Sequence, residues 1–112
     1  MRAGDLRHRI EIQDRVTPRD PETLELGEPE WRLFAQVWAQ VSPLSARDLI
    51  AAQAAQSEAT ARIVIRYRPG VLPTMRILYR GELYSIVGQP LEDPNSGREY
   101  LTLLVSKGVK DG

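Results

Sequence analysis

Cysteine is missing from this chain of 112 residues. Its absence excludes disulfides, thiolate metal sites and cysteine nucleophiles, and it leaves no clue to the redox compartment. A surplus of charge is missing too, because fifteen basic residues balance fifteen acidic ones. No overall electric field therefore steers the protein toward nucleic acid or a membrane surface.

Long hydrophobic runs are also missing. The N-terminal residues contain no apolar stretch of the kind found in a signal peptide, and no segment approaches the roughly 20 apolar residues of a membrane span. A chain of this length fits one domain with a single modest core. We therefore expect residues 1–112 to form one soluble, non-secreted domain without membrane contact.

Recognisable catalytic and cofactor motifs are lacking as well. His8 is the only histidine, and it lacks the histidine or carboxylate neighbours of a metal site or a general base. It is better interpreted as a partly buried strand residue. The serines have no G-x-S-x-G context, and the glycines form no phosphate-binding loop. The sequence therefore predicts no enzyme, no catalytic residue, no metal site and no cofactor.

What the chain does have is hydrophobic alternation with a period of two, which is typical of half-buried strands. Strands are expected at residues 6–15, 31–41, 61–68, 74–80, 82–88 and 98–106, with a tight turn at Gly81. No strand–helix–strand rhythm accompanies them. The pattern predicts a mainly β fold: a small antiparallel barrel or sandwich of about six strands, with a short helical insertion between strands two and three.

The expected strand at 31–41 is apolar on both faces. Phe34 and Trp38 stand on the face opposite to Trp31, Leu33 and the alternate residues that follow. Two explanations remain open: a partner that covers the second face, or a β-bulge that exchanges the two faces.

Residues 42–60 interrupt the strands with a segment that has little to bury. Ser45 and Asp48 form an S-x-x-D helix start, so we expect a short helix at about 46–57. Leu49 and Ile50 are followed mainly by alanine and glutamine, and a single short helix is marginal in water. Such a segment points to a protein that works through its contacts.

Residues 16–30 form a second unusual segment, with three prolines, one glycine and five carboxylates. This composition favours a mobile, negatively charged loop. The segment is longer than most connections, which leaves either a functional loop or a disordered one. The spacing of its carboxylates fits no calcium loop. We expect it to be solvated or to dock on a basic partner.

Arginine dominates the basic residues, since only Lys107 and Lys110 are lysines. The bias suits protein interfaces, but a GC-rich genome produces it as well. Several arginines fall in two expected strands that we take to form a locally basic hairpin: Arg62, Arg66, Arg68, Arg76 and Arg80. A solvated outer face and a protein contact explain them equally well, and contact with DNA phosphates ranks third.

The order and spacing of several segments resemble the head–tail joining family of tailed bacteriophages, whose members are also called head-closure or stopper proteins. The segments cover nearly the whole chain except residues 14–30 and the last few residues. They are AGDLRHRIEIQ at 3–13, Trp31, the run at 37–71, MRILYRGELYSI at 75–86 and REYLTLL at 98–104.

This resemblance implies a small β-barrel that assembles as a homo-oligomeric ring beneath the portal and its adaptor, closes the DNA-filled head and receives the tail. The protein would reside in the virion, at the head–tail interface, after a period in the host cytoplasm. The family associates the excursion between the second and third strands with the channel, where contact with DNA would be non-specific. Carried over, that excursion is residues 42–60, with Ser45, Arg47, Asp48, Gln53 and Gln56 as channel candidates.

Two other functions stay open. One is a related connector role, such as adaptor or tail terminator. The other is a small nucleic-acid-binding barrel that uses the arginines of residues 62–80. The latter predicts a DNA affinity that falls with salt and with replacement of Arg66 and Arg68 by alanine.

Overall fold

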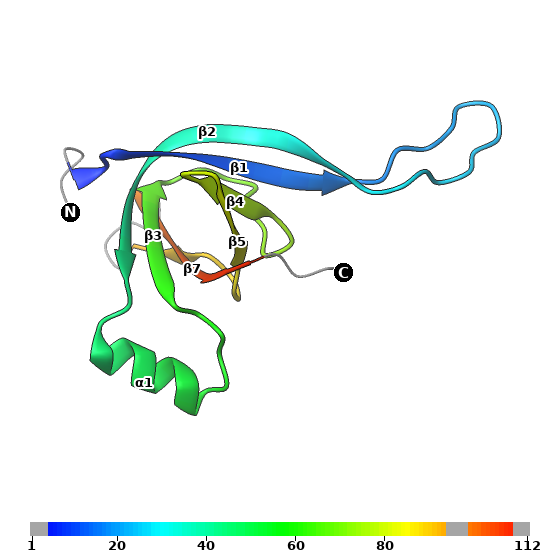
Figure 1. The fold of residues 1–112 in the computed structure, drawn as a ribbon. Helices are drawn as coiled ribbons and strands as arrows, with labels where there is room; N and C mark the ends of the chain where they lie inside the picture. Colours follow the sequence, from blue (N-terminus) through cyan, green and yellow to red (C-terminus); the bar gives the residue numbers. More distant parts are fainter. Residues whose placement is uncertain (1–4, 94–98, 109–112) are drawn as a thin grey trace.

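The computed structural model describes residues 5–93 and 99–108, and Figure 1 shows its ribbon. The elements are β1 (His8–Val16), β2 (Glu30–Pro43), α1 (Ala46–Ala54), β3 (Ala61–Arg66), β4 (Arg76–Tyr79), β5 (Glu82–Ile86), β6 (Leu91–Glu92) and β7 (Tyr100–Lys107). Each expected strand is present with shifted ends, and residue 98, the expected start of the last one, lies outside the described residues. No helix in the described ranges has the length and apolar character to cross a bilayer.

The strands form a closed antiparallel barrel. They follow the order β3-β2-β1-β4-β5-β7, and a further pairing between β3 and β7 closes the circle. The two-residue strand β6 pairs with β7 at Leu91 and Glu92. Closure satisfies the backbone groups that an open sheet would leave at its edges. The prediction of a mainly β fold with about six strands is confirmed, and of its two architectures the barrel is the one observed.

The core fills the interior of the barrel. Alternate residues of β1, β3, β4 and β7 point inward, as the period of two requires. Seven of these side chains are almost completely buried: Ile10, Ile12, Ile63, Ile65, Ile77, Leu103 and Val105. Because they are branched aliphatic side chains, they suit both the strand backbone and a tightly packed interior.

A β-bulge explains why β2 is apolar on both faces. Ile12 pairs with Ala35, but the next residue, Gln13, pairs with Leu33, so Phe34 has no partner in the ladder. Phe34 packs against the core, whereas Leu33 is exposed. The bulge is therefore the correct one of the two explanations for Phe34. Trp38 lies in the regular part of the β1–β2 pairing, away from the bulge, and its side chain remains exposed.

The β4–β5 hairpin has the tight turn expected at Gly81. Tyr79 pairs with Glu82, and the two residues between them, Arg80 and Gly81, have φ angles of 52° and 77°. Positive φ at both central residues is typical of a type I′ turn, whose twist matches that of the strands.

The insertion contains α1, which is shorter than predicted. Ser45 caps its N-terminus, because the Ser45 Oγ accepts the backbone N–H of Asp48 at 3.1 Å. At the other end, Gln56 has a φ of 58°, the Gln56 N–H donates to Gln53 O, and the Ser57 N–H donates to Ala52 O. This pair of bonds is a Schellman motif. The helix thus ends at Ala54 rather than near residue 57, because the chain reverses through a left-handed residue.

Candidate interaction surfaces

The insertion stands off the barrel at the far ends of β2 and β3 (Figure 1). No side chain of α1 is buried, and Ile50 is 66% exposed. The channel candidates Arg47, Asp48 and Gln53 are exposed on the helix, Ser45 is its N-cap, and Gln56 follows its C-cap, Ala55. A helix that buries so little inside its own chain depends on few tertiary contacts.

One face of α1 borders a groove that has the outer surface of the barrel as its other wall. The groove has a volume of about 570 Å³, and its apolar side chains come from segments far apart in the sequence: Leu44, Leu91 and Leu104. Asp48, Ala51 and Ala52 of α1 line it, together with the C-cap Ala55 and with Arg62. Sequence reasoning missed this groove because it forms only where three distant segments meet.

The arginines do not form the expected basic hairpin, so that prediction is wrong. β3 pairs with β2 and β7, whereas β4 pairs with β1 and β5. Both hydrogen-bonding edges of β3 are therefore occupied by strands other than β4. The arginines that seemed adjacent in sequence lie on different walls of the barrel, with Arg62 and Arg66 on β3 and Arg76 on β4.

Arg76 has a packing role in this arrangement. Its guanidinium carbon lies 4.1 Å from the centre of the Trp31 ring, and its Nε donates to the Gln13 Oε1 at 2.7 Å. Partial burial lowers the pKa of Arg76 from its usual value, although a guanidinium remains protonated under all ordinary conditions. Arg80 lies over Tyr79 at the tip of the β4–β5 hairpin. Neither arginine adds to the surface around β3.

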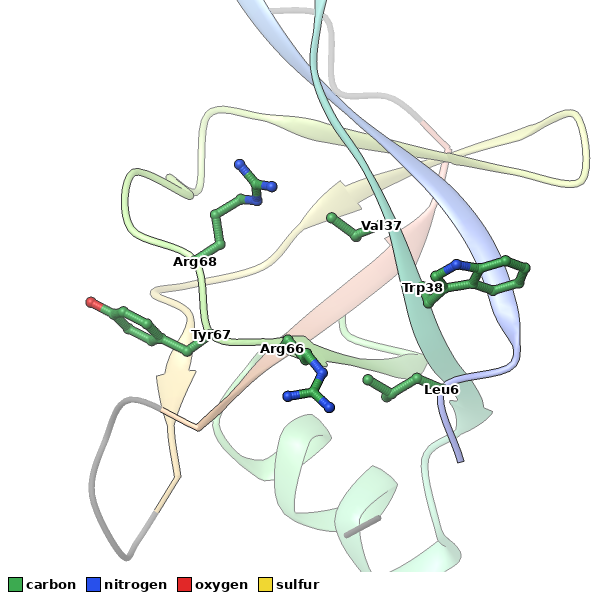
Figure 2. A pocket seen from close by; sticks show the side chains of 6 residues that line it. All are labelled: Leu6, Val37, Trp38, Arg66, Tyr67 and Arg68. Atoms are coloured by element: carbon green, nitrogen blue, oxygen red, sulfur yellow. The ribbon is translucent and has the colours of Figure 1, made fainter. Parts of the chain in front are cut away.

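Arg66 and Arg68 border an open pocket at the end of β3 (Figure 2). The pocket has a volume of about 330 Å³, and Leu6, Val37, Trp38 and Tyr67 complete its lining. Arg9 lies over the Trp38 ring, with its guanidinium carbon 5.3 Å from the ring centre. We call this site the arginine pocket. It joins an apolar floor to two guanidinium groups that make no ion pair with any residue in the described ranges.

His8 has the structural role that the sequence indicated. It is half-buried, its Nδ1 lies 2.9 Å from the Tyr79 hydroxyl, and the two rings meet edge to face. Within residues 5–93 and 99–108, no group of three or more His, Asp or Glu side chains is placed to hold a metal ion.

Residues 17–29 form an extension of the β1–β2 hairpin that projects away from the barrel (Figure 1), and we call it the arm. Its two sides are linked by an isolated β-bridge between Arg19 and Leu26 and by the Gly27 N–H, which donates to Pro18 O at 2.7 Å. The segment expected as a mobile loop is thus described as a hydrogen-bonded hairpin.

Asp20 organises the tip of the arm. Its carboxylate accepts the backbone N–H groups of Glu22 at 2.8 Å and of Thr23 at 3.4 Å. These two hydrogen bonds lower the pKa of Asp20 below its ordinary value. The folded state thus favours the ionised form, so this turn gains stability above the ordinary pKa and loses it as the pH falls through the lowered one.

Comparison with known proteins gives a consistent result. A sequence model described as phage head completion protein matches residues 1–108. Head completion protein gp7 of Enterobacteria phage HK97 is 28% identical over 117 residues, which cover 98% of this chain and 99% of gp7.

Two solved structures share the fold. The solution structure of protein SF1141 from Shigella flexneri 2a superposes with a TM-score of 0.80 at 34% identity, covering 99% of this chain and all of that one. A chain of the virion of a native gene transfer agent particle superposes with a TM-score of 0.57 at 18% identity, covering 94% of this chain and 97% of that one.

Proposed function

The chain belongs to the phage head completion protein family, and from that premise we propose that it is a structural part of the head–tail connector of a tailed phage, a prophage or a gene-transfer particle. In this proposal, copies of the chain form a ring below the portal and its adaptor after DNA packaging. The ring closes the filled head and provides the surface that receives the tail. The role is structural, so it requires no catalytic residue and no cofactor.

The family match over residues 1–108 carries this proposal. Two features of the molecule support it, since both leave side chains without a partner in the chain. The helix α1 has no buried side chain, and the arm exposes Leu24 and Leu26 to 63% each. Surfaces of this kind are typical of proteins that complete their packing in an assembly.

We extend the proposal to the channel. One face of α1 borders the groove, so the opposite face, which carries Arg47, Ile50 and Gln53, is free to face a neighbour or the channel. Ser45 and Asp48 act by starting the helix, and Gln56 by ending it. Contact of Arg47 with DNA would be electrostatic and non-specific.

Each of the other functions considered would require a different binding partner. An adaptor would bind the portal directly, and a tail terminator would bind the end of the tail tube. A nucleic-acid-binding barrel would need a continuous basic surface, and the strand order separates Arg62 and Arg66 from Arg76. We therefore favour the connector ring.

Binding to connector proteins tests the proposed function. The purified chain, mixed with the portal and adaptor of the same particle, is expected to add as a ring on the portal–adaptor complex. Electron microscopy and native mass measurement of the complex would detect it, with the portal–adaptor complex alone as the control. Failure to bind either protein under every assembly condition would contradict the proposal. A monomeric free chain would not, because such a ring can form on a template.

Hydrogen exchange tests the part assigned to α1. In the free chain, the amides of residues 45–57 are expected to exchange faster than those of β3, because α1 lacks buried contacts that would resist local opening. In the assembled complex they are expected to gain protection. The strand β3 provides the internal control, since its amides bond to β2 and β7 in both states. Equal, strong protection of α1 before and after assembly would exclude this role.

A further inference from the structure

The arginine pocket combines two chemistries in one open site. Leu6 and Val37 give it an apolar floor, and Arg66 and Arg68 stand at its rim. Figure 2 shows the Arg66 side chain extending toward Leu6, with Trp38 beside them. A group that matched this pocket would bring apolar and negatively charged side chains together. Arginine is suited to such a contact, because its planar guanidinium pairs with carboxylates and is weakly hydrated.

The arm carries the matching chemistry. Its two leucines, Leu24 and Leu26, are exposed and alternate with carboxylates in the sequence Glu22–Thr–Leu–Glu–Leu. Residues 17–29 contain four carboxylates and one basic residue, Arg19, so the arm is negatively charged. Backbone bonds shape the tip into a turn, and a preformed turn lowers the entropy lost on docking.

The two sites lie at opposite ends of the β1–β2 ribbon. At one end Arg9 pairs with Trp38, beside the arginine pocket, and at the other end Val16 pairs with Glu30, where the arm begins. Arg9 and Val16 are seven positions apart along β1, which corresponds to about 23 Å at the usual rise per residue. The arm points away from the barrel (Figure 1), so it cannot reach the pocket of its own chain.

We propose that the arm of one copy docks in the arginine pocket of the next copy, with Leu24 or Leu26 on the apolar floor and the flanking carboxylates on Arg66 and Arg68. Donor and acceptor surfaces at opposite ends of one molecule produce a head-to-tail contact, and such a contact forms a ring when its rotation closes. The inference deepens the proposed function and rests on it, because it names the surface that joins neighbours in the ring.

Cysteine cross-linking tests the contact directly, because the natural chain contains no cysteine. Two single variants, Leu24→Cys and Arg68→Cys, are mixed, assembled on the portal–adaptor complex and mildly oxidised. We expect a disulfide-linked dimer that contains one copy of each variant. The matched control replaces Arg68→Cys by Leu72→Cys, an exposed position outside the pocket, and is expected to give no such dimer.

Charge reversal provides a second measurement. The double variant Glu22→Arg with Glu25→Arg reverses the charge of these two positions on the arm. The double variant Arg66→Glu with Arg68→Glu reverses the charge of the two arginines of the pocket. Each double variant should weaken association between copies by at least about tenfold, because like charges then face each other. A chain that carries all four substitutions should recover association, which a misfolded chain could not do. Arg80→Glu, on the β4–β5 turn and outside the lining of the pocket, is the control and should leave association unchanged.

The outcomes separate the inference from the proposed function. Rings that form without the 24–68 cross-link, and whose assembly is insensitive to the arm reversal, would overturn the inference and leave the proposed function standing. If the natural chain forms no ring on its connector partners, the proposed function fails and the inference falls with it. The cross-link together with recovery in the fourfold variant would support both.

Discussion

Replacement of Ile65 by alanine is expected to lower the free energy of unfolding by about 2–5 kcal/mol, a large share of the stability of a domain of this size. Ile65 is completely buried and lies on β3, the strand that closes the barrel. It pairs with Ala39 of β2 on one side and with Leu101 of β7 on the other. A cavity at this seam removes packing from both neighbours, and backbone hydrogen bonds on both edges of β3 limit the collapse that could fill it.

Ile50→Ala is the matched control, because it deletes the same atoms from an exposed position on α1. Its effect on stability should lie within about 0.5 kcal/mol. Chemical denaturation of the two variants and of the natural chain measures both changes. An Ile65→Ala loss no larger than that of Ile50→Ala would show that the seam between β3 and β7 is not part of the folded core.

The strands were predictable because alternation is a local property. Residues such as Ile10 and Ile12 face the core whichever strand lies beside them, so a period of two indicates burial without reference to topology. Pairing is different, since the partner of a strand depends on how the whole sheet closes. The arginines show the consequence: β3 and β4 follow each other in the sequence, yet the barrel places β2 and β7 beside β3. Proximity in the sequence therefore gave a basic hairpin that the fold does not contain.

The bulge at Phe34 shows what a local sequence pattern can predict and what it cannot. The sequence placed Phe34 and Trp38 on the same face of the strand and could not choose between a bulge and a covering partner. The choice depends on the register with β1, where Gln13 pairs with Leu33 and skips Phe34. After the bulge, Phe34 lies against the core and Trp38 remains outside. Trp38 thereby becomes available to the arginine pocket.

The interaction surfaces were predictable only in part. The start of α1 follows from its Ser45 cap, and its lack of buried side chains follows from its alanine content. The arginine pocket could not be predicted, because Leu6, Trp38 and Arg66 come from three segments that meet only in the folded barrel. The composition of the arm predicts a mobile loop. Its hairpin shape comes from backbone bonds and from the Asp20 turn, which hydrophobic patterns do not report.

Excision of the arm is expected to prevent ring assembly while leaving the folding of the barrel intact. A two-residue Asn-Gly turn in place of residues 17–29 would join Val16 to Glu30, which already face each other across the hairpin; this turn suits a two-residue connection between antiparallel strands. The arm contributes no fully buried side chain, so stability should change by no more than about 1 kcal/mol. If the arm joins neighbouring copies, the same variant should fail to form rings on the portal–adaptor complex.

Thermal unfolding and electron microscopy of one preparation measure the two effects. A chain with only the tip leucines changed, Leu24→Ser with Leu26→Ser, is the matched control, because it keeps the backbone and charge of the arm while removing the apolar contact. This control should weaken ring formation less than excision does, since the carboxylates still reach the arginine pocket of the next copy. Normal rings from the armless chain would refute the role of the arm. A large loss of stability would show instead that the barrel depends on it, which the absence of buried side chains in residues 17–29 argues against.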